Sequence, residues 1–370
     1  MPVPVPVPAR VQRKNTMSAS EVVIVNAGVI TPIGLSLAET AASARARVAR
    51  LREIDWRDRR FEPFIVGTVP DEGLPELAPA LAKLPLQYRE ARMLRMADVA
   101  IVEALSSLTG KVAPVPLLLG LPEQHTTLPI DPKTFLEKLE LQVPGRIDLA
   151  RSVAVPRGRA GGLMALREAA ARLVRGDSLF VLVGGVDSLV DLYVLGTLDL
   201  EGRIRNEVNS DGFSPSEGAA FLLLSLATTA SEKGLKPLAQ LLGSAHGHEP
   251  GHVYAQEPYL GEGLAAAFEQ LLSEAPPPQP IGSVYCSFNG ERYWAREFGV
   301  ARTRQAKAFA PDQTMEHPAE CFGDMGSAQG PALAALAAHG VQQGYRQAPC
   351  LVFASSDRGD RAASLLGRIP

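Results

Sequence analysis

Residues 153–191 have the layout in which α/β enzymes present a nucleophile, but their turn contains no nucleophilic side chain. The segment reads VAVPRGRAGGLMALREAAARLVRGDSLFVLVGGVDSLVD: an extended approach, a glycine-containing turn, a helix of small residues and a buried strand. Arg157 and Arg159 lie in the turn. Beside the N–H groups of a helix start they could bind a carboxylate or phosphate. The favoured alternative is an internal ion pair with Asp324 or Asp357, because a buried arginine needs a partner.

The three cysteines offer little further chemistry. Cys286, Cys321 and Cys350 are far apart and form no CxxC pair, which argues against a disulfide framework or a structural zinc site and fits a reducing cytoplasm. Two of them lie in apolar runs that predict buried strands. Cys321 is the candidate for a reactive thiol, but the neighbouring carboxylates Glu320 and Asp324 would raise the pKa of its thiol.

Two further patterns resemble binding motifs. His246, His248 and His252 lie within seven residues, as in a metal-binding tract, but no cysteine pair or fourth ligand stands nearby, so a polar surface loop is favoured and no metal or cofactor is expected. The segment GRAGG at 158–162 lacks the frame of a nucleotide-binding loop, which argues against a nucleotide.

The chain that must position these residues alternates apolar strands with helical segments. Continuous apolar runs such as VPLLLGL at 115–121 predict strands covered on both faces, so we expect an α/β protein with mostly parallel sheets. Ser36 and Asp131 stand where helix N-caps are expected. The alternation repeats after residue 236. We therefore expect a flexible proline-rich leader at 1–20 and two similar halves at 21–235 and 236–370.

Composition excludes some classes of function. The 370 residues are 46% hydrophobic and 21% charged, with a net charge of -3. This balance gives no reason to expect nucleic acid or an anionic membrane surface as a partner. The sequence has no apolar run long enough to span a membrane. A cytoplasmic protein is expected.

Four segments in order along the chain resemble the β-ketoacyl synthase branch of the thiolase-like superfamily. They are VVIVNAGVITPIG at 22–34, GLMALREAAARLVRGDSLFVLVGGVDSL at 162–189, DGFSPSEGAAFLLL at 211–224 and GDMGSAQGPALAALA at 323–337. The resemblance implies two βαβαβ halves stacked in five layers, αβαβα. It also implies dimerisation, which we expect through the strand Leu179 to Gly184, with Leu179, Phe180, Val181 and Leu182 at the dimer contact.

The same resemblance implies that the catalytic residues have been replaced. Active members carry the acyl group on a cysteine in a Cys-x-x-Gly pattern, which places Arg159 at the cysteine, or Gly158 or Ala160 if the alignment shifts by one residue. The first family histidine corresponds to Asn289, with Glu297 at the acid that follows it. The second corresponds to Asp324.

Two further family features differ as well. The family lysine falls near Ala319, and the glycine-rich C-terminal loop reads SSDRGDRAAS here. Because the nucleophile, one histidine, the lysine and the loop differ together, the resemblance implies a degenerate site and a protein that is not an enzyme.

The leading hypothesis is a homodimeric thiolase-fold protein that acts through protein binding. A looser resemblance favours an adaptor or co-chaperone in the loading of a type VI secretion effector, with a secretion chaperone or effector as partner. Tyr293, Trp294 and Phe298 either contact that partner or pack internally. One alternative is a chain-length-factor-like subunit of a ketosynthase heterodimer, with an acyl carrier protein as a further partner. A second is an atypical acyltransferase using Cys321.

Overall fold

The computed structural model describes residues 21–110, 113–124 and 127–369, so the leader expected at 1–20 lies outside the described residues. Ten strands form one hydrogen-bonded series in the order β10-β9-β11-β12-β8-β1-β7-β6-β4-β5, and β2 and β3 form a separate pair. The strands are β1 Val22–Ile30, β2 Leu51–Arg57, β3 Pro63–Gly67, β4 Leu117–Gly120, β5 Val153–Val155, β6 Phe180–Ser188, β7 Glu217–Leu226, β8 Ala239–His248, β9 Ile281–Cys286, β10 Phe309–Glu316, β11 Cys350–Ser355 and β12 Asp360–Gly367.

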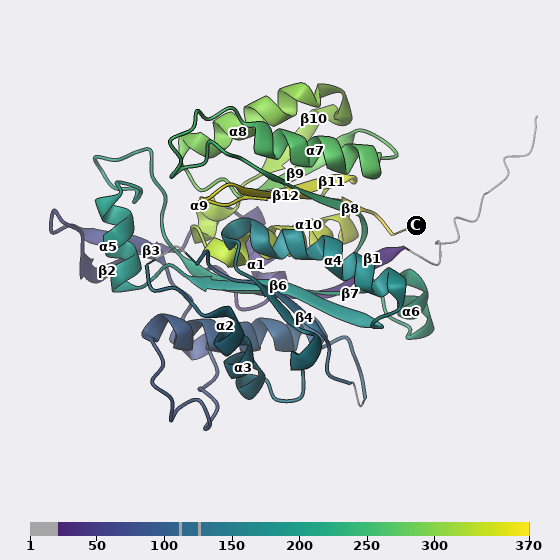
Figure 1. Cartoon of the computed structure of the whole chain (residues 1–370), viewed down its shortest axis with the longest axis horizontal. Helices are drawn as coiled ribbons and strands as arrows, with labels where there is room; N and C mark the ends of the chain where they lie inside the picture. Colours follow the sequence, from purple (N-terminus) through teal and green to yellow (C-terminus); the bar gives the residue numbers. More distant parts are fainter. Residues whose placement is uncertain (1–20, 111–112, 125–126, 370) are drawn as a thin grey trace, which may run out of the picture.

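The ten strands divide into two stacked sheets with helices between and outside them (Figure 1). The sheets join where β1 and β8 pair through the residues 22–24 and 239–241. Helices α4 and α10 lie between the sheets, α7 and α8 cover one outer face, and α2 and α3 cover the other, which gives the expected αβαβα layering. The helices are α1 Leu37–Arg45, α2 Tyr88–Leu105, α3 Pro132–Gln142, α4 Gly161–Arg175, α5 Leu192–Leu200, α6 Ala227–Glu232, α7 Glu262–Glu274, α8 Arg292–Arg304, α9 Ala319–Phe322 and α10 Gln329–Gln342.

Local sequence explains where two of the helices begin. The hydroxyl of Ser36 accepts a hydrogen bond from the Glu39 N–H at 3.2 Å, and Asp131 Oδ1 accepts one from the Thr134 N–H at 2.8 Å. Pro132 follows in the first turn of α3, where its missing N–H costs nothing. Both N-caps expected from the sequence are therefore present.

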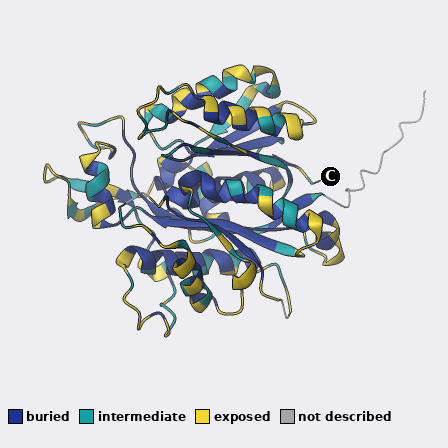
Figure 2. Ribbon diagram, viewed as in Figure 1, coloured by how far each residue is buried: buried dark blue, intermediate teal, exposed yellow. Residues whose placement is uncertain are grey.

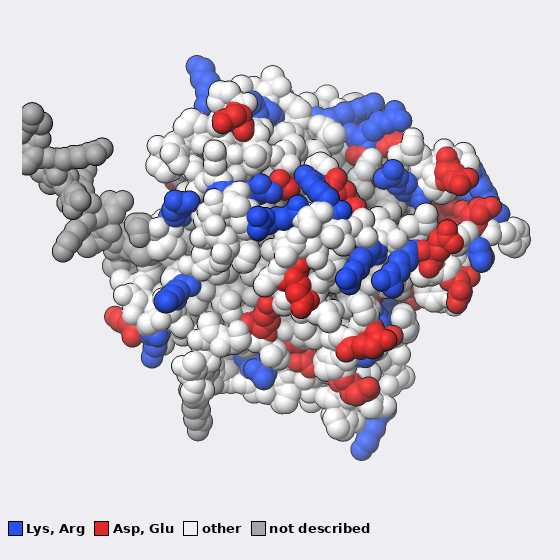
Figure 3. Space-filling model, turned by 180° about the vertical axis from the view of Figure 1, so that it is seen from behind, with Lys and Arg blue, Asp and Glu red and all other residues white. Residues whose placement is uncertain are grey.

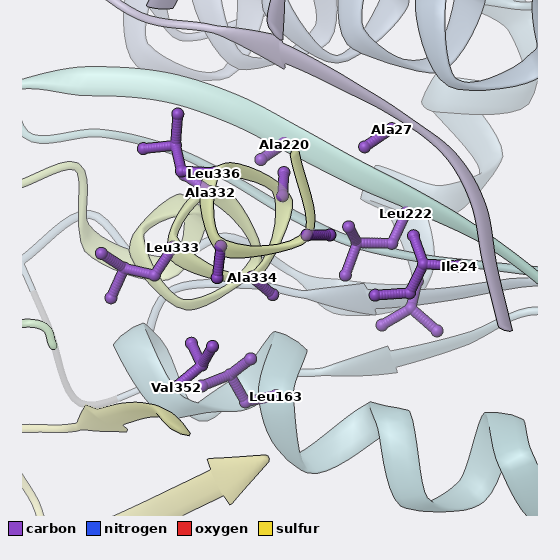
Figure 4. Close-up of a cluster of buried hydrophobic side chains, with 14 of the residues drawn as sticks. Ile24, Ala27, Leu163, Ala220, Leu222, Ala332, Leu333, Ala334, Leu336 and Val352 are labelled. Atoms are coloured by element: carbon purple, nitrogen blue, oxygen red, sulfur yellow. The ribbon is translucent and has the colours of Figure 1, made fainter. Parts of the chain in front are cut away.

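The middle layer is the most deeply buried part of the molecule (Figure 2). Helix α10 is built from alanine and leucine, and its residues 329–338 are all buried. Figure 4 shows Leu333 and Leu336 of this helix among side chains from β1, β7, β11 and α4. Helices α4 and α10 cross closely: a Cβ atom on Gly162 would lie 2.2 Å from Cγ of Pro331. Small residues therefore let the two helices, and the site at their N-termini, come together.

The strand expected at the dimer contact lies inside the sheet. Strand β6 pairs with β4 on one side and with β7 on the other, and Val181 and Leu182 are fully buried. Because both edges of β6 are already hydrogen-bonded, it cannot extend the sheet into a second subunit. Leu179 is exposed but precedes the strand. The expectation of a dimer strand at 179–184 is therefore wrong. The terminal strands of the described sheet are β5 and β10.

Candidate functional site

Arg159 lies at the start of the buried helix α4. It is the middle residue of the 3-10 turn Gly158–Ala160 (η3), and its exposed fraction is 5%. Gly158 has φ +59°, a left-handed conformation that glycine adopts without the penalty of a side chain. A second 3-10 turn, Gly326–Ala328 (η5), opens α10 beside it. The site thus stands where the two middle-layer helices begin.

Two carboxylates hold the Arg159 guanidinium. Its Nε lies 3.0 and 2.8 Å from the two carboxylate oxygens of Asp324, and an Nη atom lies 2.5 Å from Asp324 Oδ2. The other Nη atom lies 2.6 Å from Asp357 Oδ1. Burial lowers the pKa of Arg159, but the two carboxylates outweigh it and the net shift is upward. The side chain is therefore a buried cation with fixed partners.

These contacts belong to a closed ring of polar side chains. Asn289 Nδ2 donates to Asp324 at 2.8 Å and to Glu291 at 3.1 Å. Arg203 pairs with Glu291 at 2.8 Å and with Asp357 at 2.8 Å, which closes the ring. Burial raises the pKa of Asp357, but Arg159 and Arg203 outweigh burial and the net shift is downward. The six members are Arg159, Arg203, Asn289, Glu291, Asp324 and Asp357.

The backbone N–H next to Arg159 is hydrogen-bonded to a serine hydroxyl. The Ala160 N–H donates to Ser356 Oγ at 2.9 Å, and this hydroxyl donates to the Arg157 carbonyl at 2.5 Å. An N–H group at the start of a helix is the kind of donor that stabilises an oxyanion in acyl transfer. Here that N–H is already hydrogen-bonded within the protein.

The charged C-terminal loop is a tight turn that closes over the ring. It connects β11 to β12 as an antiparallel hairpin, with Gly359 at φ +101°. Asp357 joins the ring, and Arg358 lies over the Tyr254 ring at 4.8 Å. The Arg358 N–H donates to Glu123 at 3.1 Å. Burial and then the charge of Asp357 raise the pKa of Glu123 to about 7.

A small cavity remains beside the ring. Its volume is about 120 Å³, and Gly158, Arg159 and Asp357 form one side of it. Arg89 and Asp187, a buried ion pair with a 2.8 Å separation, also line it. The apolar part of the wall includes Leu189, Val194, Leu198 and Phe213, and polar residues such as Glu123, Thr197 and Glu201 line the rest. This volume is somewhat smaller than the about 150 Å³ that holds a benzene-sized molecule.

Several residues proposed from the sequence lie outside the ring. Arg157 has a 57% exposed side chain and pairs with Asp360 at 3.3 Å. Trp294 is 1% exposed and Phe298 is 9% exposed. The Phe298 ring stacks on Phe353 at 5.3 Å, and the Tyr293 hydroxyl donates to the Gly251 carbonyl at 2.8 Å. Trp294 and Phe298 therefore pack internally, so their interpretation as a partner contact is wrong, whereas that of the partly exposed Tyr293 stays a prediction.

The remaining family positions are also built into the protein. Glu297 is fully buried against Arg361 and accepts a hydrogen bond from Ser355 Oγ at 2.5 Å. Ala319, at the family lysine, is buried in α9. All three cysteines are buried, and burial is the largest cause of the raised pKa of the Cys321 thiol. The described residues contain no cluster of side chains suited to a metal ion. His246 and His248 lie in strand β8 and only His252 lies in the loop after it, so the surface loop expected for this tract is wrong for two of its three histidines.

Sequence reasoning missed Arg203, Glu291 and Tyr254. Arg203 contacts partners 88 and 154 residues away in the chain, and Arg205 two positions later has the same local surroundings. The Tyr254 hydroxyl accepts from Arg203 at 3.0 Å and donates to Glu201 at 2.7 Å. No spacing rule could identify these residues, because loops from both halves bring them together.

The outer surface shows mixed charge. On the face shown in Figure 3, Lys and Arg side chains are interspersed with Asp and Glu side chains. None of the described helices is long and apolar enough to cross a membrane.

Comparison with known sequences gives a short match. No family model matches the chain. Over 139 residues, 34% of this chain, the sequence is 34% identical to a 6-methylsalicylic acid synthase of Arthrobotrys oligospora, of which the match covers 8%. The chain therefore corresponds to a small part of that relative.

Comparison with solved structures covers nearly the whole chain. The ishigamide ketosynthase/chain length factor matches with a TM-score of 0.71 and 19% identity, over 95% of this chain and 100% of that one. A Streptomyces albus oxazolomycin ketosynthase domain matches with a TM-score of 0.74 and 15% identity, over 95% and 76%. A type II polyketide ketosynthase in complex with its acyl carrier protein matches with a TM-score of 0.71 and 15% identity, over 94% and 99%. The chain has the thiolase-like fold of these ketosynthases. These three similarities are to ketosynthases, and they lend no support to the type VI secretion hypothesis.

Proposed function

We propose that this chain is a non-catalytic, chain-length-factor-like subunit that pairs with a Cys-containing ketosynthase, with an acyl carrier protein as a further partner. The observation that carries the proposal is the buried Arg159, held by Asp324 and Asp357 at the position that the sequence resemblance aligns with the acyl-carrying cysteine. The similarity to the ishigamide ketosynthase/chain length factor, over the full length of that chain, supports the same class.

The chemistry of the site argues against an acyl-enzyme. Acyl transfer of this type needs a nucleophile that can be activated, and a charged guanidinium is not one. The neighbouring Ala160 N–H is bonded to Ser356 Oγ. The cavity beside Arg159, of about 120 Å³, is smaller than the about 150 Å³ that holds a benzene-sized molecule. On this proposal the protein acts through its surfaces, and the ring stabilises the fold at the place where other members perform chemistry.

Strand β5 is the edge through which we expect the subunits to pair. It ends the described sheet, and its residues Val153–Val155 include no proline or charge, whereas the opposite terminal strand β10 contains Pro311 and Asp312. Prolines and charges are the usual protection of an exposed edge against pairing. The Val155 carbonyl accepts from Leu121 on the inner side of the strand. Neighbouring residues of a strand face opposite edges, so the Ala154 N–H faces outward.

Ala154→Pro tests this pairing. The substitution removes an outward N–H while leaving the hydrogen bond to Leu121 in place. We expect the wild-type chain to co-purify in a one-to-one complex with a Cys-containing ketosynthase from the same organism when the two are co-expressed. We expect Ala154→Pro to weaken that complex at least tenfold, as measured by light scattering during size-exclusion chromatography.

Two results would count against the proposal. A wild-type chain that forms no complex with the ketosynthase cannot be its partner subunit. A stable mass increase of the isolated chain after incubation with an acyl thioester would favour the acyltransferase alternative instead.

A further inference from the structure

Helix α5 exposes an apolar stripe although its other face is already packed. Its sequence is LYVLGTLDL, and Leu192, Tyr193 and Leu200 are 50%, 67% and 73% exposed. These positions and Gly196 recur every three to four residues, so they share one face of the helix. A Cβ atom on Gly196 would meet no atom within 4 Å. We call Leu192, Tyr193, Gly196 and Leu200 the α5 stripe.

The inner face of the same helix already has its partners. Leu195 packs with Phe64, Val66 and Ile204 in a small hydrophobic cluster. Val194 and Thr197 line the cavity beside the ring. A helix that is apolar on both faces is normally buried on both, because removing apolar surface from water is favourable. The stripe is thus the apolar surface of α5 that stays half or more exposed at Leu192, Tyr193 and Leu200 within the described residues.

The stripe lies at the end of the sheet where β5 also ends. Strands β4, β5 and β6 run parallel, so their carboxyl ends meet at one end of the sheet. Strand β6 leads into α5, which projects from that end (Figure 1). A hydrogen bond of 2.7 Å between the hydroxyls of Thr127 and Thr197 connects α5 to the segment after β4. Helix α5 therefore lies at the same end of the sheet as the carboxyl end of β5.

An area argument indicates what covers the stripe. A stable complex buries about 800 Å² per partner and involves roughly 20–30 residues on each side. The three residues of β5 are far too few for such an interface. The pairing proposed above therefore needs additional apolar surface near the edge, and α5 supplies it. The stripe is uncharged, so it can pack against an apolar surface of a partner. The glycine at its centre has no side chain, so the partner can approach the helix backbone closely.

We propose that the α5 stripe is a contact surface for the ketosynthase subunit, a proposal that rests on the function proposed above. The partner surface is apolar and belongs to a second thiolase-fold chain. The inner face of α5 borders the cavity, so the partner lies one helix thickness, about 10 Å, from it.

A paired substitution tests the stripe. Tyr193→Glu with Leu200→Lys places an acid in the first turn of α5 and a base at its last residue, charges that suit the helix dipole, so the variant should fold. We expect the complex with the co-expressed Cys-containing ketosynthase to weaken at least tenfold by light scattering. The matched control is Val174→Lys in the last turn of α4, where the side chain is 55% exposed, and it should bind as the wild type does.

The outcomes separate this inference from the proposed function. If the wild type binds the ketosynthase and the double variant binds it equally well, the stripe is not the contact and the function stands. If the wild type forms no such complex, both are overturned. If the isolated chain is a dimer that the double variant dissociates, the stripe binds a second copy of this chain, which overturns the ketosynthase as its occupant.

Discussion

Two turns of the same construction open the two buried helices, and they hold different residues at their centres. Turn Gly158–Ala160 reads Gly-Arg-Ala and precedes α4, and turn Gly326–Ala328 reads Gly-Ser-Ala and precedes α10. Their glycines have φ values of +59° and +52°. For a residue with a Cβ atom this conformation is less favourable by about 1–2 kcal/mol, so a glycine at the first position allows both turns to have the same backbone. The two turns therefore differ mainly in the contacts of their central side chains.

The two central side chains make contacts of very different kinds. Arg159 is held in a ring with side chains from several loops. Ser327 donates its hydroxyl to the Val186 carbonyl at 2.8 Å, and its N–H donates to Asp187 Oδ2 at 3.0 Å. The central side chain is therefore a buried charge in one turn and an uncharged hydroxyl in the other. The comparison teaches that a turn can keep its backbone while its side chain changes from one chemistry to another, provided the new charge finds partners.

Arg159→Ala should produce the largest effect in this comparison. Removing the guanidinium leaves Asp324 and Asp357 buried with fewer partners, and breaking a buried ion pair on one side costs about 3–5 kcal/mol. We expect a loss of this size in the free energy of unfolding, measured by urea denaturation at pH 7. Arg159→Lys keeps the charge but loses the two-pronged geometry, so its loss should be smaller. A loss below about 1 kcal/mol for Arg159→Ala would mean that the ring does not stabilise the fold.

The first turn also shows how far sequence reasoning could reach. The family resemblance aligned Arg159 with the nucleophile, and the need of a buried charge for partners indicated Asp324 and Asp357. The pairing partner Arg203 could not be found this way. Its exposed fraction is 6%, although the segment EGRIRNE at 201–207 is rich in charged residues, as is typical of a surface loop. Long-range contacts, rather than local pattern, decide whether such a charge is buried.

The elements missed by the sequence analysis have the same cause. Strand β12 begins with Asp360 and Arg361, two charges that suggest a loop, yet Arg361 is fully buried because Glu297 neutralises it. The dimer strand was misplaced because the family resemblance assigned it to the strand after α4, and the apolar residues there do not show whether that strand lies at the centre or the edge of a sheet. By contrast, the N-caps Ser36 and Asp131 depend on neighbours within three residues, and the sequence predicted them.

Glu123→Gln tests whether Glu123, beside the first turn, makes the free energy of unfolding depend on pH. A Cβ atom on Gly158 would lie 3.1 Å from Glu123 Cγ, and the pKa of Glu123 is raised to about 7. The folded protein therefore binds this proton more tightly than the unfolded chain, and the stabilisation present at low pH is lost as the pH rises through about 7. Glutamine can still accept the Arg358 N–H and does not titrate. We expect its advantage in the free energy of unfolding over the wild type to grow by about 1–3 kcal/mol between pH 5 and pH 8.

The chosen pH range separates the titration of Glu123 from that of the ring carboxylate Asp357. The pKa of Asp357 is shifted downward, so Asp357 stays ionised above pH 5 and its own contribution to stability is lost only in stronger acid. An advantage of Glu123→Gln that is the same at pH 5 and pH 8 would show that Glu123 does not titrate in this interval.

Ser327→Ala should give the smallest effect and completes the comparison of the two turns. The substitution removes the hydroxyl that donates to Val186, while the backbone N–H can still donate to Asp187. A neutral buried hydrogen bond contributes about 1 kcal/mol, and the carbonyl left behind in β6 adds a comparable penalty at most. We therefore expect a loss of about 1–2 kcal/mol in the same urea experiment, clearly less than for Arg159→Ala. Equal losses would mean that the packing of the two helix starts, and not the ion ring, determines stability here. A loss near zero would mean that the second turn is held by its glycine and backbone alone.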